Sequence, residues 1–214
     1  MNDSSTTLYL VRHGETQWNL EHRFQGQKDS PLSPRGIKQI NTLGPYFEKN
    51  HIDALYSSDL GRAMTTANII SQVTGLQVEA LKALRERCFG IFEGLTHEPA
   101  REIQPQLFDQ WRSGSMDVKV PGGESRQEML DRVLPALYQI IDQHPGQKVA
   151  IVSHGGTLSA LWRFLEPSRP ESDGFSIPNA SISTLSGQHK KLLVLKWSEI
   201  NHLKGLKSLD DPSI

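Results

Sequence analysis

The sequence predicts an α/β fold: a three-layer α/β/α sandwich with a mostly parallel sheet, helices on both faces and one mixed edge. The main observation is that short apolar runs alternate along the chain with stretches of helical periodicity. Two of these runs, Leu8–Val11 and Val149–Val152, are followed by Arg-His-Gly and Ser-His-Gly. A hairpin pattern near the C-terminal end accounts for the mixed edge.

The first run ends at Arg12, His13 and Gly14. Ligands of open α/β sheets bind at the carboxyl ends of the strands, so these residues occupy the expected position of a site. Arg12 offers a planar fork of donors that suits phosphate oxygens. His13 offers a nitrogen nucleophile that is mostly neutral near pH 7, and Gly14 permits close approach of a ligand. Taken alone, the triplet is equally compatible with a solvated turn.

The second run ends at Ser153, His154, Gly155 and Gly156, and a helical pattern follows directly. If the two strands are parallel neighbours, His13 and His154 face each other across one crevice. The backbone N–H groups at the start of the following helix would point to the same place, which is a natural anion site. The repeated pattern therefore favours a phosphate site over a solvated turn.

A helix is predicted after the first strand, because Ser33 can cap it and Pro34 suits its first position. Apolar residues recur at helical spacing over 37–47. The Gly44-Pro45 pair predicts a kink in this helix. Residues 53–58 are then typical of a second strand.

The next helix is expected to be capped by Asp59 and to end near Gly75. This places Arg62 in the first turn, where it projects toward the strand ends. From its position alone, Arg62 is equally typical of a surface helix. Residues 76–80 predict a short edge strand, and 84–94 predict a loop with two glycines.

The second half of the chain begins with an amphipathic helix over 99–111, which has apolar residues at intervals of four. Ser125 and Glu128 form a capping box before a long helix, in which Pro135 predicts a bend or a late start. Three prolines and no periodicity predict a loop over 166–180. Two final strands, 182–185 and 192–197, form the expected hairpin around Gly187.

The composition fits a single domain over residues 1–214, with 214 residues and a net charge of −1. This charge argues against nucleic acid as a partner. No apolar run approaches the length of a membrane span, so we expect no membrane partner and a cytoplasmic protein, either monomer or homodimer. Cys88 is the only cysteine, which excludes an internal disulfide. The polar N-terminal residues and the tail from about 201 are expected to be disordered.

Together these motifs resemble the histidine phosphatase superfamily, also called phosphoglycerate mutase-like. The resemblance covers about 8–197, nearly the whole chain, and implies a six-stranded sheet. The residues that carry it are Leu10–Thr16, Asn19, Ser57–Ala63, Leu84–Glu86 and Ser153–Gly156.

The resemblance implies that His13 attacks phosphorus and forms a phosphohistidine. Arg12, Arg62 and a protonated His154 would lower the pKa of His13 and stabilise the transferred group. The implied phosphate-binding residues are Arg12, Asn19, Arg62, His154 and Gly155. Neither a metal nor a cofactor is implied.

Glu86 matches the acid/base position of the family, where one carboxyl group protonates the leaving oxygen and later deprotonates water. Glu93, seven residues later, is its rival, although it is also typical of a turn. Glu15 is interpreted as structural. The remaining histidines lack paired spacing and are interpreted as surface residues: His22, His51, His97, His144, His189 and His202.

Within the family, the sequence favours the phosphatases over the cofactor-dependent mutases. Mutases carry a longer insertion between the Glu position and the last helix-and-strand unit, and this insertion helps to close the site against water. In this chain only residues 95–123 lie in that interval. The stretch 122–125 also resembles the phosphatase branch, which includes broad phosphomonoesterases, α-ribazole phosphatase and phosphoserine phosphatase. We therefore predict a metal-independent phosphoric monoester hydrolase of the histidine acid type that acts on a small-molecule phosphate ester. The alternatives are a mutase and a non-catalytic phosphate-binding scaffold.

Four apolar residues are candidates to line the pocket for the leaving group, and ordinary packing in the core is the alternative for each. They are Phe89, Phe92, Trp111 and Met116.

Overall fold

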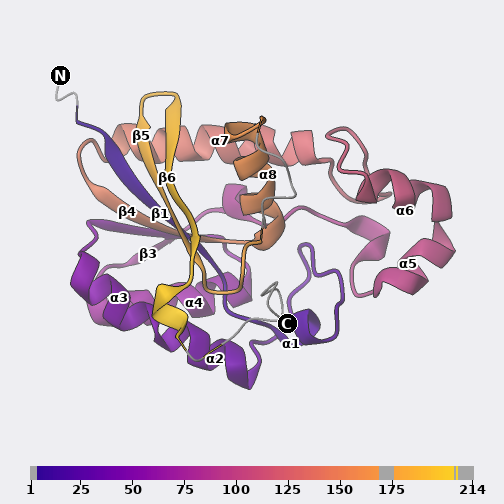
Figure 1. Cartoon of the computed structure of the whole chain (residues 1–214), viewed down its shortest axis with the longest axis horizontal. Helices are drawn as coiled ribbons and strands as arrows, with labels where there is room; N and C mark the ends of the chain where they lie inside the picture. Colours follow the sequence, from indigo (N-terminus) through magenta and orange to yellow (C-terminus); the bar gives the residue numbers. More distant parts are fainter. Residues whose placement is uncertain (1–3, 169–175, 205, 207–214) are drawn as a thin grey trace.

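The computed structural model describes residues 4–168, 176–204 and 206, and its centre is one six-stranded sheet (Figure 1). The strand order is β3-β2-β4-β1-β5-β6. The pairs β1–β4, β2–β4 and β2–β3 are parallel, whereas β5 is antiparallel to β1 and to β6. This confirms the mostly parallel sheet with a mixed edge. The strands are β1 (Thr6–Arg12), β2 (Ala54–Ser57), β3 (Val78–Ala80), β4 (Lys148–Ser153), β5 (Ile182–Gln188) and β6 (Lys191–Glu199).

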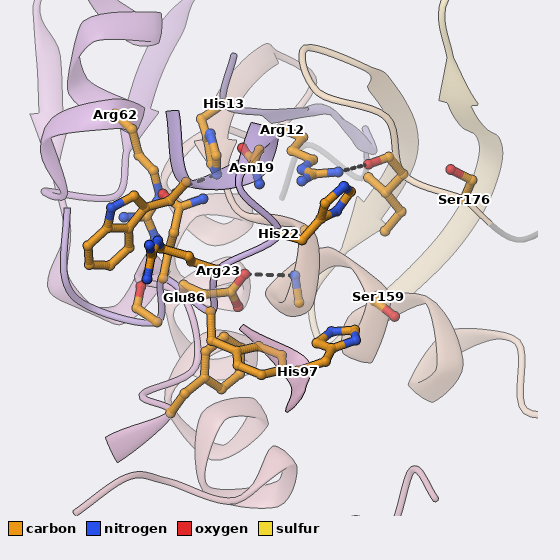
Figure 2. A pocket seen from close by; sticks show the side chains of 18 of the residues that line it. Arg12, His13, Asn19, His22, Arg23, Arg62, Glu86, His97, Ser159 and Ser176 are labelled. Atoms are coloured by element: carbon orange, nitrogen blue, oxygen red, sulfur yellow. Dashed lines mark hydrogen bonds between the residues drawn. The ribbon is translucent and has the colours of Figure 1, made fainter. Parts of the chain in front are cut away.

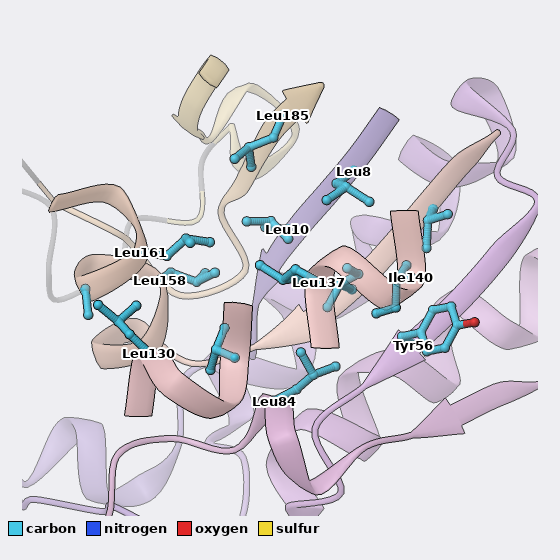
Figure 3. Packing of buried hydrophobic residues seen from close by; sticks show 14 of the residues in the cluster. Leu8, Leu10, Tyr56, Leu84, Leu130, Leu137, Ile140, Leu158, Leu161 and Leu185 are labelled. Carbon is cyan, nitrogen blue, oxygen red and sulfur yellow. The ribbon is translucent and has the colours of Figure 1, made fainter. Parts of the chain in front are cut away.

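Helices cover both faces of the sheet, as predicted (Figure 1). One face is covered by α2 (Pro34–Asn41), α3 (Leu43–Asn50) and α4 (Gly61–Thr74), and the other by α7 (Arg126–Gln143) and α8 (Gly155–Leu165). Residues of β1 alternate between the two cores because successive side chains of a strand point to opposite faces. Leu8 and Leu10 pack against α7 and α8 (Figure 3), whereas Tyr9 and Val11 pack toward α2–α4.

Most of the residues that were predicted to begin or end a helix do so in the structure. The Ser33 hydroxyl accepts a hydrogen bond from the Gly36 N–H at 2.9 Å, and Gly75 ends α4 in the left-handed conformation. The capping box at Ser125 is present, so α7 starts before Pro135 and has no late start. The break expected at Gly44-Pro45 falls earlier, at Thr42, where the chain divides into α2 and α3.

Two local predictions were wrong. Asp59 does not cap α4, because its carboxylate accepts two hydrogen bonds from Arg85, at 2.6 and 2.7 Å. The helix expected over 99–111 is two helices, α5 (His97–Ile103) and α6 (Pro105–Arg112), because Pro105 lacks the N–H that would continue the first one. Ile103 is therefore exposed, and Phe108 joins a separate small aromatic core instead.

The C-terminal hairpin turns at His189, whereas Gly187 lies inside β5. A Cβ atom at position 187 would lie 2.5 Å from Ile141 of α7, so the glycine allows close packing there. The first residues of the tail are ordered, contrary to expectation, because Asn201–Leu203 form a 3-10 helix that buries Leu203. Thr6 and Thr7 likewise belong to β1, and of the residues expected to be disordered, 1–3, 205 and 207–214 lie outside the described residues. No helix within the described part of the chain is long and apolar enough to cross a membrane.

Three short helices complete the elements around the site. They are α1 (Gln17–Leu20), η1 (Lys82–Leu84) and η2 (Gly90–Phe92).

Candidate active site

The two His-Gly motifs meet at the carboxyl ends of adjacent parallel strands. Arg12 of β1 pairs in register with Ser153 of β4, so His13 and His154 follow side by side. Their ring centroids are 5.2 Å apart, and both side chains are buried. They lie beside a cavity of about 750 Å³ that His13 lines (Figure 2). The two motifs thus meet as predicted, although His154 is fully buried and does not line the cavity.

His13 is held in one tautomer. Its Nδ1 lies 2.7 Å from the carbonyl oxygen of Gly14, an acceptor, so Nδ1 carries the proton. Its Nε2 lone pair is left to accept a hydrogen bond from Nε of Arg62 at 3.3 Å. Burial, and then the charges of Arg62 and Arg12, hold the pKa of His13 well below 6.5. The imidazole is therefore a neutral nitrogen base at neutral pH.

Gly14 has a different role from the expected one. A Cβ atom there would lie 2.5 Å from Ile40 and 2.9 Å from the carbonyl oxygen of Gly36. The glycine therefore lets α2 pack closely against the end of β1, which fixes the backbone next to His13.

Arg62 projects from the first turn of α4 into the site and is almost fully buried. Its Nη1 donates to the Asp29 carboxylate at 2.9 Å and to the Lys28 carbonyl at 2.8 Å, and its Nη2 donates to the Gly26 carbonyl at 2.7 Å. Loop 26–29 thus orients the guanidinium beside His13. No motif or spacing in the sequence predicted that this loop contacts Arg62.

Three of the other residues predicted to bind phosphate, Arg12, Asn19 and Gly155, also reach the cavity. Arg12 lines it, and its Nη1 donates to the Ile177 carbonyl at 2.5 Å. Oδ1 of Asn19 accepts the N–H of Thr16 at 3.1 Å, which leaves its Nδ2 available as a donor to a ligand. Gly155, at the start of α8, lines the same wall.

Glu86 lies on the cavity wall and is 7 % exposed. One carboxylate oxygen accepts the Gly156 N–H at 2.8 Å, and the other accepts the N–H of Arg87 at 2.8 Å and the hydroxyl of Thr157 at 3.2 Å. These three donors fix the carboxylate at the N-terminus of α8. Figure 2 shows it in the middle of the site, across from His13.

Arg132 of α7 holds the segment that carries Glu86. Its Nη1 donates to the carbonyl oxygens of Ala83 and Arg85, at 2.8 and 2.9 Å, and its Nη2 donates to that of Glu86 at 3.0 Å. Glu124 pairs with the same guanidinium and accepts the Cys88 N–H at 3.0 Å. The segment therefore keeps a fixed backbone although it lacks long helices or strands.

The rival carboxylates are engaged in structural contacts. An oxygen of Glu93 accepts the N–H groups of Gln27 and Phe89, at 2.9 and 3.0 Å, and Glu93 does not line the cavity. Glu15 is fully buried and accepts the Ser33 hydroxyl at 2.7 Å. This geometry favours Glu86 as the acid/base group.

His154 differs from the expected protonated residue. Burial, and then the charges of Arg62 and His13, hold its pKa well below 6.5, so the imidazole is neutral at neutral pH. Neither ring nitrogen has a hydrogen-bond partner within the described part of the chain. A neutral imidazole still has one N–H, which can be donated to a phosphate oxygen.

We predict that the protein loses stability as the pH falls below about 6.5, and that His154→Gln reduces this loss. Histidines of the unfolded chain titrate near 6.5, whereas those at 13 and 154 titrate well below it in the folded protein. Between these pH values the unfolded chain binds more protons, so the free energy of unfolding falls as the pH falls, by up to about 1.4 kcal/mol per pKa unit and group. Stability above 6.5 is unaffected by this linkage. Thermal unfolding at about pH 7.5 and 5.5 measures the effect.

The matched control is His51→Gln, because His51 is exposed. This variant should lose as much stability as the wild-type protein. An undiminished loss in His154→Gln would contradict the buried neutral state of His154.

The outer part of the cavity contains residues that sequence reasoning missed. His22 and His97 are exposed, as expected of surface residues, but both also line it. Of the four residues proposed for a leaving-group pocket, only Phe89 lines it. Phe92 and Trp111 are buried in the small aromatic core, and Met116 packs against the main core. The other missed lining residues include Trp18, Arg23, Arg112, Ser159 and Arg163.

Comparisons with known proteins show what this chain is similar to in sequence and in fold. The family model described as histidine phosphatase superfamily (branch 1) matches residues 8–200. A metal-independent phosphoserine phosphatase of Arabidopsis thaliana is 36 % identical over 204 residues, which are 94 % of this chain and 84 % of that protein. A phosphoglycerate mutase structure from Bacillus anthracis has a TM-score of 0.85 at 27 % identity and covers 96 % of this chain and 98 % of its own. A mycobacterial glucosyl-3-phosphoglycerate phosphatase structure has a TM-score of 0.81 at 30 % identity, with 92 % and 100 % covered.

Proposed function

We propose a phosphomonoesterase activity, with a phosphohistidine intermediate on His13, for this chain, which belongs to the histidine phosphatase superfamily (branch 1). The observation that carries the proposal is the geometry of His13, with Nδ1–H donated to Gly14 and a neutral Nε2 beside Arg62. A neutral, oriented imidazole next to a guanidinium can attack the phosphorus of a bound dianion.

In the first step, Nε2 of His13 forms a bond to phosphorus while the ester P–O bond breaks. Arg12, Arg62 and an N–H of His154 stabilise the charge on the phosphoryl oxygens. Glu86, in its acid form, gives its proton to the leaving oxygen, so that an alcohol departs.

In the second step, water attacks the phosphohistidine. Glu86, now ionised, accepts a proton from this water, and the N–P bond breaks. Inorganic phosphate leaves, and His13 and Glu86 return to their starting states. The cycle requires no further reactant.

The substrate that we propose is a small-molecule phosphate ester. The volume of about 750 Å³ suits a metabolite rather than a phosphate ion alone. Two of the similar proteins are named as phosphatases of such esters, phosphoserine and glucosyl-3-phosphoglycerate, which supports hydrolysis as the reaction.

We predict that the chain releases phosphate from p-nitrophenyl phosphate at an undiminished rate in excess EDTA. Arg12 and Arg62 supply the positive charge that a metal ion supplies in other phosphatases. Colorimetric assay with and without EDTA measures this directly. A large loss that magnesium restores would contradict metal independence. No release at all would reject the phosphomonoesterase and favour a non-catalytic phosphate-binding scaffold.

A phosphoglycerate mutase activity is the second candidate, because one of the similar structures is named as such a mutase. We predict little isomerisation of 3-phosphoglycerate in the presence of 2,3-bisphosphoglycerate, compared with phosphate release. The reason is that residues 95–123 hold only α5 and α6, so water has access to the phosphoenzyme. Coupled assays for the isomerised phosphoglycerate and for released phosphate distinguish the two activities. Efficient isomerisation without net phosphate release would reverse the assignment.

A further inference from the structure

The two oxygens of the Glu86 carboxylate have different hydrogen-bond partners. Oε1, the inner oxygen, accepts two hydrogen bonds, from the N–H of Arg87 at 2.8 Å and from the hydroxyl of Thr157 at 3.2 Å. Oε2, the outer oxygen, accepts one bond from the described residues, that of the Gly156 N–H at 2.8 Å. A carboxylate oxygen has two lone pairs, so the inner oxygen is saturated and the outer oxygen keeps one lone pair for a proton.

The surroundings of the two oxygens also differ in their access to the substrate. Gly156, which bonds the outer oxygen, lines the cavity. Arg87 and Thr157, which bond the inner oxygen, are only 5 % and 2 % exposed and do not line it. Figure 2 shows the Glu86 side chain within the site. The lone pair that is left for a proton therefore lies on the cavity side of the carboxylate.

The Thr157 hydroxyl is the one side-chain donor among these three partners. It has a single hydrogen and three acceptors within reach, which are Oε1 of Glu86, the carbonyl oxygen of Arg85 at 3.1 Å and Sδ of Met129 at 3.5 Å. The Arg85 carbonyl already accepts a bond from Arg132, and a thioether is a weak acceptor. Because an ionised carboxylate is the strongest acceptor of the three, the hydroxyl bonds the inner oxygen when Glu86 is ionised.

The other charged and titratable groups around Glu86 keep one charge state at neutral pH. The imidazoles of His13 and His154 are neutral, and burial lowers the pKa of Arg87 to about 10 and raises that of the Cys88 thiol. Glu124 is held ionised by its pairing with an arginine. The remaining groups are arginines, which stay protonated. They are Arg12, Arg62, Arg85 and Arg132.

We propose that Thr157 is a positioning residue for proton transfer: its hydroxyl occupies the inner oxygen of Glu86 and thereby keeps the transferable proton on the outer oxygen. This rests on the proposed function and specifies how its acid is oriented. In the first step the outer oxygen gives its proton to the leaving oxygen, and the hydroxyl stabilises the carboxylate that forms. In the second step the outer oxygen accepts a proton from the attacking water. The hydroxyl keeps its own proton throughout.

The test is Thr157→Val, which keeps the branched shape of the side chain and removes the hydroxyl. Ionised Glu86 then loses a charge-assisted hydrogen bond, so a higher pH is needed to ionise it. With glycerol 3-phosphate, kcat/KM declines at high pH because Glu86 loses its proton, and we expect this decline to move up by about one pH unit. Phosphate monoesters are dianions above about pH 7, so the substrate does not titrate in this range.

A second effect is expected below that decline, where Glu86 is protonated in both proteins. Without the hydroxyl, the proton also occupies the inner oxygen, from which it does not reach the substrate. We expect kcat/KM to fall by about three- to tenfold more with glycerol 3-phosphate than with p-nitrophenyl phosphate, whose leaving group needs little protonation. Thr157→Ser retains a hydroxyl and should keep both the wild-type pH profile and the wild-type ratio of the two substrates. If thermal unfolding shows that the valine variant is not folded, Thr157→Ala removes the same hydroxyl and should give the same two results.

The matched control is Thr74→Val, because the Thr74 hydroxyl also donates to a carbonyl, that of Ile70 at 2.9 Å, but Thr74 does not line the cavity. It should keep the wild-type pH profile. When Glu86→Gln is already present, Thr157→Val should change the ratio of the two substrates no further.

An unshifted pH profile or an unchanged substrate ratio in Thr157→Val overturns the role of Thr157, and so does a serine variant that behaves like the valine variant. In each of these cases the wild-type protein is active and the proposed function stands. A wild-type protein that hydrolyses neither substrate rejects the proposed function, and the role of Thr157 is rejected with it.

Discussion

Replacement of His13 by alanine is expected to lower phosphate release by roughly 10⁴- to 10⁶-fold with every phosphomonoester. The variant lacks the nitrogen that accepts the phosphoryl group, so no covalent intermediate can form, whatever the leaving group. The imidazole also donates a hydrogen bond to Gly14, so thermal unfolding should be measured to show that the variant is folded. Rapid quenching with radiolabelled substrate then reports the intermediate.

His51→Ala is the control, because it removes an exposed histidine that precedes β2 and does not line the cavity, and it should retain both activity and labelling. The wild-type adduct should be labile in acid and stable in base, as expected of a phosphohistidine. An equally labelled His13→Ala would move the nucleophile to another group. His154 would then be tested first, because its ring lies 5.2 Å away.

Glu86→Gln is expected to discriminate between leaving groups. The amide keeps the size of the side chain but has no proton to give to a leaving oxygen. A p-nitrophenolate departs as a weak base and needs little protonation, whereas an alkoxide departs as a strong base and needs much. We expect kcat/KM to fall by about 10²- to 10³-fold more for an alkyl phosphate than for p-nitrophenyl phosphate. The measurement is the ratio of kcat/KM for the alkyl phosphate to kcat/KM for p-nitrophenyl phosphate, compared between the wild type and the variant.

The second step should show a separate defect in the same variant. Water attack on the phosphohistidine loses its base, so the aryl substrate should give a burst and an accumulated adduct. Glu93→Gln is the matched control, because glutamine keeps the oxygen that accepts the N–H groups of Gln27 and Phe89. An equal loss on both substrates in Glu86→Gln, with leaving-group dependence in Glu93→Gln instead, would assign the acid role to Glu93.

The parts of the fold that could be predicted are those with a local signal. The apolar run of β1, the Ser125 capping box and the end of α4 at Gly75 each depend on neighbouring residues only, and the structure contains all three. The pairing of His13 with His154 was also accessible, because both follow strands that the βα alternation makes parallel.

What could not be predicted depends on contacts between distant segments. Asp59 is a good N-cap by type, but Arg85 is a stronger partner for its carboxylate in the folded chain. No rule of sequence spacing predicts the ion pair between Arg62 and Asp29. His97 is exposed, as predicted, but its place on the cavity wall could not be predicted, because it depends on how the helices around Pro105 fold against the rest of the chain.

The sheet order has a consequence for how the protein acquires its active site. β1 lies at the centre of the sheet between β4 and β5, and both neighbours come from the last third of the chain. A ribosome-bound chain that ends before β4 has made His13, Arg62 and Glu86 but cannot assemble them. Folding therefore involves high contact order and waits for late segments, which slows it. Enzymatic activity should consequently report completion of the whole fold, since no earlier fragment contains a formed site.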